Sequence, residues 1–314
     1  MSQNPVIVIA GPTASGKSQL AIDLALEFNG IIVNADASQI YKNIPVIAAS
    51  PSEEDKNIVE HRLYEYVDNC VHRNVVSWLN DAVVEIKNIW SEGKVPVVVG
   101  GGGLYIDNLI NGTTPIPEIS VEIRNRVMSF LEEEGVGALY ERLQAEDLKA
   151  AEMLNPKDTT RVRRAYEIFL QTGISIADWY QKPMNKKLPE AEFFVIKLLP
   201  SKSGLDERCD LRFDKMIESG AIEEVKTLAS KNLSKDMPSM RAQGVPEILA
   251  YLSGAMTLSD AVELAKIHTR QYAKRQITWF KNKLNADVSI DNCYTGQKEV
   301  LNNLKQLLKK QLHK

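Results

Sequence analysis

Short apolar runs alternate with amphipathic stretches over roughly the first hundred positions of the chain. Residues 6–10 (VIVIA), 31–33 (IIV) and 95–99 (VPVVV) are continuous and mostly β-branched, which is typical of strands buried on both faces of a parallel sheet. Apolar side chains recur every three or four positions over 17–28 and 75–90, as they do on one face of an amphipathic helix. Strands that alternate with helices predict an α/β fold, with a doubly wound parallel-sheet core flanked by helices.

The alternation stops at a connection that contains Pro115 and Pro117. Residues 118–179 are predicted to be helical, and 182–189 form a second connection before a strand at 193–199. We therefore expect a core of 1–117 and 185–290, interrupted by an all-helical insertion domain over 118–184. Helices inserted between two sheet strands suit a lid that grips a substrate, and a longer crossover is the simpler alternative.

The last third of the chain is also predicted to be helical. Apolar periodicity favours helices over 208–231, 245–253 and 259–283. A tail of 291–314 follows, with a Lys-rich amphipathic helix at 298–313. No internal repeat of solenoid length is present in the sequence, which excludes that architecture.

Composition and charge narrow the class of protein. Of 314 residues, 38 are Lys or Arg and 41 are Asp or Glu, so the formal net charge is −3. This balance argues against non-specific coating of nucleic acid, but it permits a local basic face that binds one structured RNA. The apolar runs are far shorter than the roughly 20 residues that span a bilayer, and no secretory signal pattern opens the chain. Because Cys70, Cys209 and Cys293 are widely spaced, we expect reduced thiols in a cytoplasmic protein with no membrane partner.

Residues 11–18 (GPTASGKS) fit the phosphate-loop pattern GxxxxGK(S/T), which many nucleotide-binding and ATP-binding proteins carry. The motif follows a predicted strand and opens a predicted helix, so its backbone amides and the helix N-terminus are expected to surround phosphate oxygens. Lys17 is expected to reach the terminal phosphate oxygens, and Ser18 to help hold Mg²⁺. The predicted diphosphate-binding residues are Gly11, Thr13, Ala14, Ser15, Gly16, Lys17 and Ser18.

Phosphate binding does not by itself define a reaction. The strand at 95–99 ends in glycine, not in the Asp that holds Mg²⁺ in many ATP-hydrolysing relatives of this loop. Asp36, just after the strand at 31–33, is the carboxylate at the carboxyl end of a strand, where ligands of such sheets bind. It could hold metal or act as a general base, and a helix N-cap is the structural alternative.

With residues 11–18 and 36–41 (DASQIY) in view, the chain resembles the tRNA dimethylallyltransferase family, also called tRNA isopentenyltransferases. Residues 100–105 (GGGGLY) are similar to the family's GGTGLY, and 161–167 (RVRRAYE) to its RxxRAxE. Residues 212–220 resemble its RxxxMxxxG, and 269–279 its TRxxAKRQxTW. The matches extend from residue 6 to about residue 283.

The resemblance implies transfer of a dimethylallyl group from dimethylallyl diphosphate to N6 of the adenosine 3′ of the anticodon, in tRNAs that read codons beginning with U. Mg²⁺ assists, and diphosphate leaves. On the same resemblance Asp36 is the catalytic base, and Thr13 and Arg212 hold the diphosphate near its bridging oxygen. The substrate partner is the anticodon stem-loop of tRNA, and we expect a monomer without an obligatory protein partner.

The resemblance also implies RNA contacts, which would otherwise be interpreted as solvated helix faces. The predicted tRNA-binding residues are Asp36, Ala37, Ser38, Gln39, Gly102, Arg124, Thr160, Arg161, Arg163, Arg164, Arg241, Gln243, Gly244, Arg270, Lys274 and Arg275.

The sequence departs from the family pattern at several positions. Ala37 replaces a usual Ser, Gly102 replaces a Thr that touches RNA in relatives, and Ala48, Ser50 and Val245-Pro246 also differ. A lost neutral hydrogen bond costs about 0.5–1.5 kcal/mol, which predicts a slower enzyme or an altered tRNA choice. Two alternatives stay open: another phosphate-loop transferase, such as an adenylate isopentenyltransferase or a small-molecule kinase, and a tRNA-anticodon binder with weakened catalysis.

Overall fold

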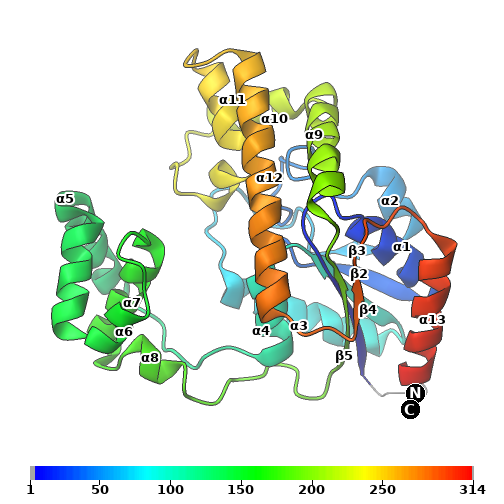
Figure 1. The fold of residues 1–314 in the computed structure, drawn as a ribbon, viewed down its shortest axis with the longest axis horizontal. Coiled ribbons are helices and arrows are strands. Elements are labelled where there is room, and N and C mark those ends of the chain that lie inside the picture. Colours follow the sequence, from blue (N-terminus) through cyan, green and yellow to red (C-terminus); the bar gives the residue numbers. More distant parts are fainter. Residues whose placement is uncertain (1–3, 313–314) are drawn as a thin grey trace. The chain divides into compact units, whose positions relative to one another are not determined.

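A computed structural model describes residues 4–312 of the chain. Its centre is a six-stranded sheet in which every strand pair is parallel, with the order β3-β2-β4-β1-β5-β6 (Figure 1). The strands are β1 (Pro5–Ala10), β2 (Gly30–Asn34), β3 (His61–Arg62), β4 (Val95–Gly100), β5 (Glu192–Leu198) and β6 (Val288–Ile290).

Helices cover both faces of this sheet, because successive strand residues point to opposite sides. Val6 and Val8 of β1 join one buried cluster, whereas Ile7 and Ile9 join another. The second cluster is closed by α1 (Lys17–Glu27) and α13 (Lys298–Leu312). The helices on the first face include α3 (Val75–Ser91), α4 (Gly103–Asn111), α10 (Ala221–Ser230), α11 (Val245–Leu252) and α12 (Leu258–Lys283).

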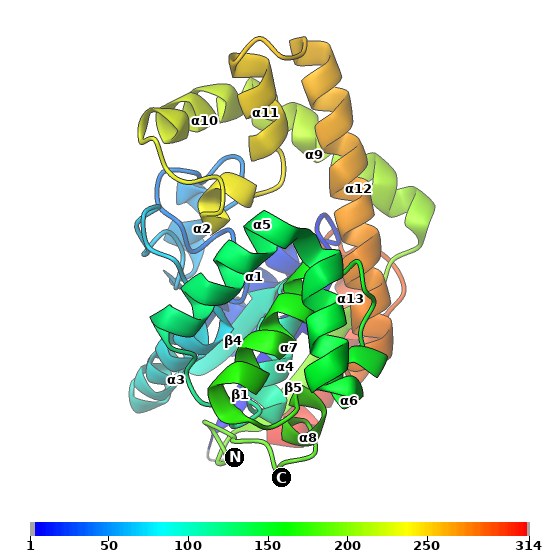
Figure 2. The same ribbon diagram turned by 90° about the vertical axis from the view of Figure 1, so that its left-hand side faces the viewer.

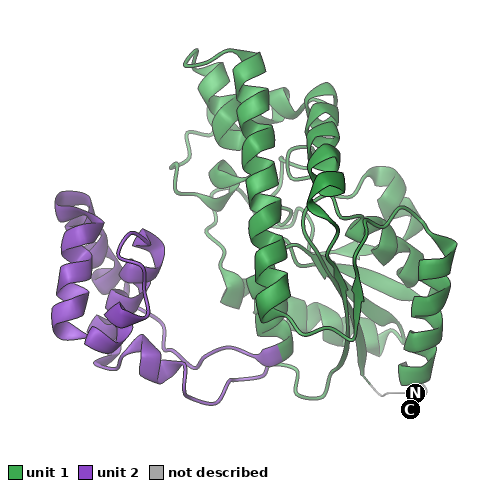
Figure 3. Ribbon diagram, viewed as in Figure 1, with its two compact units in different colours: residues 1–110, 187–314 green, residues 111–186 purple. Residues whose placement is uncertain are grey.

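The chain divides into two compact units (Figure 3). Unit 1 comprises residues 1–110 and 187–314, and unit 2 comprises 111–186, a few residues wider at each end than the expected 118–184. Unit 2 has a buried core of its own, around Leu139, Leu143 and Val162. Its helices are α5 (Val121–Glu146), α6 (Leu148–Glu152), α7 (Thr159–Thr172) and α8 (Ile176–Trp179).

The C-terminal third differs from the expected pattern. In place of one helix over 208–231, α9 (Lys202–Glu218) ends before Gly220, whose φ of 98° lies in the left-handed region, and α10 follows. α12 runs beside α9, as Figures 1 and 2 both show. Residues expected as a tail belong to unit 1: Leu304 and Leu308 of α13 are buried, and Lys305 and Lys309 pair with Glu27 of α1. His313, the expected last residue of that helix, lies outside the described residues.

Some short elements gave no signal in the sequence pattern. These are β3, β6, α2 (Glu53–Ile58), α4 and the 3₁₀ turn at Pro238–Arg241. The two strands, α2 and the 3₁₀ turn are too short for periodicity to identify them, and the strands form only by pairing with a neighbour. The start of α4 lies in the glycine run after β4, which is not a pattern typical of a helix. Within 4–312, none of the helices is long and apolar enough to cross a membrane.

Lys197, the residue before the last of β5, has a buried side chain. Its Nζ donates to the carbonyl oxygens of Phe280 (3.2 Å) and Leu284 (2.8 Å), at the C-terminus of α12. They are among the last carbonyls of the helix, and the Phe280 carbonyl oxygen also accepts the N–H of Leu284 (3.4 Å). Lys197→Met is therefore expected to lower the free energy of unfolding by about 1–3 kcal/mol, because both carbonyl oxygens lose this buried donor.

Urea denaturation of Lys197→Met and of Lys226→Met, a variant on the exposed face of α10, measures this effect. The Lys226 variant should unfold at the midpoint of the parent protein. An unchanged midpoint for the Lys197 variant would show that the two hydrogen bonds do not stabilise the junction of β5 and α12.

Candidate active site

The carboxyl ends of four neighbouring strands meet at one edge of the sheet. β1 leads into the phosphate loop, β2 into Asp36, and β4 into a run of glycines that ends at Gly103, whereas β5 ends at Leu198. In open parallel sheets, ligands bind outside these ends, where the loops of adjacent strands diverge. The candidate site of unit 1 is built from these loops together with α9 and α12.

The phosphate loop between β1 and α1 has two residues with left-handed backbone. Ala14 has a φ of 61° and Gly16 a φ of 89°, and Gly16 is the N-cap of α1. A Cβ atom on Gly16 would collide with the carbonyl of Tyr294, so this position requires glycine for close approach as well as for its backbone angle. The Lys17 ammonium folds back to the Pro12 carbonyl oxygen (3.3 Å).

Two cations converge on this loop. Arg212 of α9 donates a hydrogen bond from Nη2 to the Thr13 hydroxyl. Burial lowers the pKa of Lys17 to about 8, Asp36 partly opposes this, and Arg212 adds to it. Burial also lowers the pKa of Arg212. Two desolvated cations beside one loop, each with its pKa lowered by burial, favour an anionic ligand there.

Asp36 has a rigid backbone support. The buried Asn34 side chain accepts from the Asp36 N–H (2.8 Å) and donates to the carbonyl oxygens of Asp36 (3.1 Å) and Leu63 (3.0 Å). One carboxylate oxygen of Asp36 accepts the N–H of Ser38 (3.0 Å). The carboxylate is partly exposed, so it is positioned and still accessible to a ligand.

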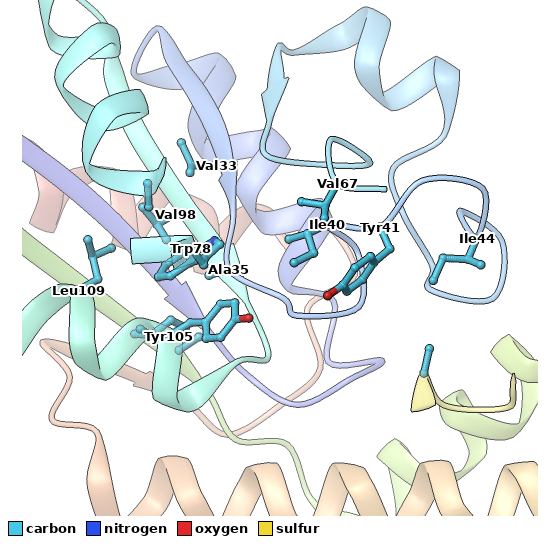
Figure 4. Close-up of a cluster of buried hydrophobic side chains, with 14 of the residues drawn as sticks. Val33, Ala35, Ile40, Tyr41, Ile44, Val67, Trp78, Val98, Tyr105 and Leu109 are labelled. Carbon is cyan, nitrogen blue, oxygen red and sulfur yellow. The ribbon is translucent and has the colours of Figure 1, made fainter. Parts of the chain in front are cut away.

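Aromatic side chains support the turn between β2 and Asp36 (Figure 4). The Trp78 and Tyr105 rings stack with centroids 4.6 Å apart, and the Trp78 indole donates to the Asn34 carbonyl oxygen (2.9 Å). Because stacking and a hydrogen bond both hold the Trp78 indole, this side chain supports the backbone that leads to Asp36.

A narrow cavity of about 50 Å³ opens between the phosphate loop, Asp36 and helices α9 and α12. Polar and apolar side chains both line it, as expected of a site for an amphipathic ligand. Its lining consists of Thr13, Asp36, Ser38, Ile47, Ala48, Cys209, Arg212, Phe213, Met216, Gln243, Thr269 and Tyr272.

The glycine run after β4 is shaped by close backbone contacts. A Cβ on Gly102 would lie 2.5 Å from the Ala35 carbonyl oxygen, which already accepts the Gly102 N–H (3.1 Å). A Cβ on Gly101 would collide with the Gln276 amide. The loop therefore lies too close to Ala35, the residue after β2, to take a side chain at position 102 without moving. The replacement of the family's Thr by Gly102 thus coincides with a close contact between two backbone segments.

The other predicted RNA contacts after Asp36 have differing environments. Ala37 is exposed and Ser38 is half-buried. Gln39 uses its side-chain amide within the loop, where it donates to the carbonyl oxygens of Ala48 (3.1 Å) and Ala49 (2.6 Å). These hydrogen bonds hold the segment that contains Ala48, one of the residues that line the cavity.

Two of the predicted basic contacts of unit 1 form ion pairs within it. Arg270 is held by Asp210 of α9 (2.5 and 2.6 Å), and Arg241 pairs with Asp236. Lys274 and Arg275 are exposed on α12. Two neutral positions, Gln243 and Gly244, precede α11; Gln243 lines the cavity, and Gly244 caps the helix with a φ of 91°.

In unit 2, the predicted contacts lie on α5 and α7. Arg163 and Arg164 both pair with the buried Glu167 (3.4 and 3.5 Å). Thr160 and Arg161 are exposed in the first turn of α7, where Arg161 approaches Asp158 (3.5 Å). The remaining position, Arg124 of α5, is exposed and 4.0 Å from Glu118.

Ser18, the predicted metal ligand, is exposed in the first turn of α1. Among the described residues, no group of three or more His, Cys, Asp or Glu side chains is arranged to hold a metal ion. A metal at this loop would accordingly take its ligands mainly from phosphate oxygens and water.

Sequence reasoning missed several residues of the site. Gln276 accepts from the Thr13 N–H and donates to the Gly101 carbonyl oxygen (2.9 Å each), and it lies 263 positions from Thr13 in the chain. Tyr272 lines the cavity, and Arg208 contacts the phosphate loop. Gln276 and Tyr272 lie in the segment 269–279 quoted above, but spacing alone gives no reason to place them at the loop.

Comparison with known sequences gives one consistent result. A model of the family described as IPP transferase matches residues 39–283. The chain is 41% identical to the tRNA dimethylallyltransferase of Rickettsia massiliae, over 98% of this chain and 84% of that protein. It is 45% identical to the tRNA dimethylallyltransferase of Zymomonas mobilis, over 90% of this chain and 89% of that protein.

Solved structures agree with the sequence comparison. A tRNA isopentenylpyrophosphate transferase from Bacillus halodurans is 30% identical, with a TM-score of 0.71 over 99% of this chain and 97% of that one. A eukaryotic dimethylallyltransferase, studied acting on tRNA, is also 30% identical, with a TM-score of 0.82 over 97% of this chain and 78% of that one.

Proposed function

The chain belongs to the tRNA dimethylallyltransferase (IPP transferase) family, and we propose that it moves the dimethylallyl group of dimethylallyl diphosphate to N6 of the adenosine 3′ of the anticodon, in tRNAs that read codons beginning with U. The observation that carries the proposal is a single cavity. Asp36, Thr13 and Arg212 line it together with apolar side chains. One site thus offers a base, diphosphate ligands and a surface for a short hydrocarbon.

In this proposal the phosphate loop stabilises the leaving group. The bond between the allylic carbon and the diphosphate oxygen breaks, and negative charge grows on that oxygen. Arg212 and Thr13 are hydrogen-bonded to each other at the loop, and Lys17 lies beside them with its pKa lowered by burial. Preorganised donors and cations of this kind act where charge develops in the transition state.

Asp36 is the proposed general base. The exocyclic amine of adenine is a weak nucleophile, because its lone pair is delocalised into the ring. A carboxylate that accepts a hydrogen bond from N6 orients the amine, and it takes the proton as the N–C bond forms. The support that Asn34 gives to the Asp36 backbone suits this role, because a general base must lie within hydrogen-bond distance of the proton it removes.

The donor set at the loop fits Mg²⁺ as a companion of the diphosphate. Mg²⁺ keeps several waters and binds through one or two protein oxygens together with phosphates. Ser18 supplies such an oxygen at the start of α1. When bound, Mg²⁺ neutralises charge on the diphosphate.

Exposed basic residues support RNA binding in each unit. Arg161 is exposed on α7 of unit 2, and Lys274 and Arg275 are exposed on α12 of unit 1. Contacts of Arg and Lys to phosphate set affinity and position for an anticodon stem-loop, without regard to sequence. As part of the same proposal the protein works as a monomer in the cytoplasm, where its substrate tRNA is found.

A transfer assay tests the proposal. Purified protein, Mg²⁺ and labelled dimethylallyl diphosphate are incubated with an anticodon stem-loop that carries A-A-A after the second anticodon base, and in parallel with AMP. Label that moves to the RNA, and not to AMP, is the expected result. Transfer to AMP would instead support an adenylate isopentenyltransferase. No transfer, with tight salt-dependent binding of the stem-loop, would support a binder whose catalysis is lost.

A further inference from the structure

Three residues far apart in the chain hold consecutive residues of the phosphate loop from outside. Gln276 Oε1 accepts the N–H of Thr13 (2.9 Å), and Arg208 Nε donates to the carbonyl oxygen of Ala14 (2.8 Å). The backbone N–H of Tyr294 donates to the carbonyl oxygen of Ser15 (2.9 Å). We call Arg208, Gln276 and the Tyr294 backbone the loop clamp.

The clamp is itself anchored in the fold. Gln276 is buried in α12, and its other amide atom is bound to the Gly101 carbonyl oxygen (2.9 Å). Tyr294 is buried, and its hydroxyl donates to Asp23 of α1 (2.6 Å). Gln276 and Tyr294 therefore connect the loop to two different packed parts of the fold, and Arg208 connects it to α9.

Clamping a carbonyl also fixes the neighbouring amide, because the C=O and N–H of a trans peptide point in opposite directions. The Ala14 carbonyl faces Arg208, so the Ser15 N–H faces the other way, where it donates to the Pro12 carbonyl oxygen (3.3 Å). The Ser15 carbonyl faces Tyr294, so the Gly16 N–H is turned away from Tyr294. The Ser15 N–H thus closes a turn within the loop, and the Gly16 N–H is the amide that the clamp leaves turned toward the anion-binding concavity of a phosphate loop.

Ala14 shows what the clamp holds in place. Its φ of 61° lies in the left-handed region, which an alanine disfavours and a glycine adopts freely. Such conformations persist where the surroundings determine them, and here the Arg208 hydrogen bond ends on the carbonyl of this residue.

We propose that Arg208 is a positioning residue for diphosphate binding: with Gln276 and Tyr294 it holds the phosphate loop, and Ala14 in particular, in the anion-binding conformation before the ligand arrives. The inference rests on the proposed function for the identity of the diphosphate donor. The inference itself concerns the conformation of the phosphate loop, so the binding of any diphosphate can test it.

The test is a double-mutant cycle between Arg208→Met and Ala14→Gly, with inorganic pyrophosphate and Mg²⁺ as the probe in isothermal titration calorimetry. Arg208→Met alone is expected to weaken pyrophosphate binding about tenfold. In the background of A14G the same Arg208→Met change should cost at most about twofold, because glycine needs no clamp to adopt this φ. A tenfold loss in both backgrounds would mean that Arg208 acts through its charge, and it would overturn the proposal.

Further measurements separate positioning from general structural damage. For Arg208→Met, the KM for the prenyl donor should rise with the pyrophosphate Kd, whereas the Kd for the anticodon stem-loop and the melting temperature should stay close to those of the parent. Lys202→Gln, which removes an exposed charge earlier on the same helix, should leave pyrophosphate affinity within about twofold. A matching loss in the Lys202 variant, or unchanged affinity in Arg208→Met, would contradict the inference.

If Arg208→Met does not fold, Ala14→Val provides a second variant. A β-branched side chain disfavours positive φ, so it should weaken pyrophosphate binding with Arg208 in place. Retained affinity in that variant would overturn the proposal. Because pyrophosphate binding is measured without prenyl transfer, a protein that binds pyrophosphate through the clamp and transfers nothing would refute the proposed function and leave this inference standing.

Discussion

Asp36→Asn is expected to lower kcat for prenyl transfer by about 10²–10⁴-fold, the range supplied by a positioned general base. Asparagine has the same shape, and its side-chain oxygen can still accept the Ser38 N–H that Asp36 now accepts (3.0 Å). The backbone at 36 is held by Asn34 and does not depend on the carboxylate. The variant therefore loses an acceptor for the N6 proton while its fold is kept.

Single-turnover kinetics with prebound stem-loop RNA measure this effect, and RNA affinity is measured beside it. Asp260→Asn, in the first turn of α12 and outside the cavity, is the matched control and should react at the parent rate. Stem-loop affinity should be largely unchanged in both variants. A kcat for Asp36→Asn equal to that of the parent would remove Asp36 from the role of base.

Lys17→Met is expected to reduce kcat/KM for the prenyl donor by about 10²–10³-fold, the loss seen when one preorganised donor to developing negative charge is removed. Methionine keeps the length of the side chain and loses its charge. The variant should fold, because the contact that Lys17 makes in the structure is a hydrogen bond to its own loop at Pro12 (3.3 Å). Lys226→Met on α10 is the control for the loss of one positive charge.

The pH dependence of the parent should identify Lys17 directly. Its pKa in the free protein is lowered to about 8, chiefly by burial, so the ammonium is charged below pH 8 and neutral above it. Binding of a diphosphate requires the charged form. The kcat/KM for the donor is therefore expected to be constant below about pH 8 and to fall tenfold per pH unit above it.

A comparison of pH profiles makes this test specific. A bound diphosphate raises the pKa of Lys17, so kcat at saturating donor should stay constant to higher pH than kcat/KM does. The fall above about pH 8 should disappear in Lys17→Met, which has no group to titrate there. The same fall in both proteins would assign the titration to another residue.

Much of the fold could be predicted because it depends on local patterns. The three continuous β-branched runs became β1, β2 and β4, and the amphipathic stretches became α1 and α3. The division of 208–231 into two helices was missed, because the left-handed backbone at Gly220 interrupts an apolar pattern that continues on both sides. Edge strands such as β6 were missed because three residues give no periodicity.

Charge patterning alone did not distinguish a basic residue that is free to meet RNA from one already paired. Arg270 and Lys274 lie one turn apart on α12, yet Arg270 is held by Asp210 of α9 and Lys274 is exposed. The difference depends on which face of α12 packs against α9. That packing joins residues about 60 positions apart, which no spacing rule describes.

The sequence by itself determined the phosphate loop, its place between a strand and a helix, and the position of Asp36 at the end of the next strand. These features follow from residue types within a few positions of one another, such as the glycines at 11 and 16 and the β-branched run before Asp36. Only the tertiary structure decided how the loop is held. Arg208, Gln276 and Tyr294 reach it across some 190 to 280 positions of chain. Long-range hydrogen bonds of this kind exist only after the sheet and its helices have packed, because packing brings their donors and acceptors within bonding distance.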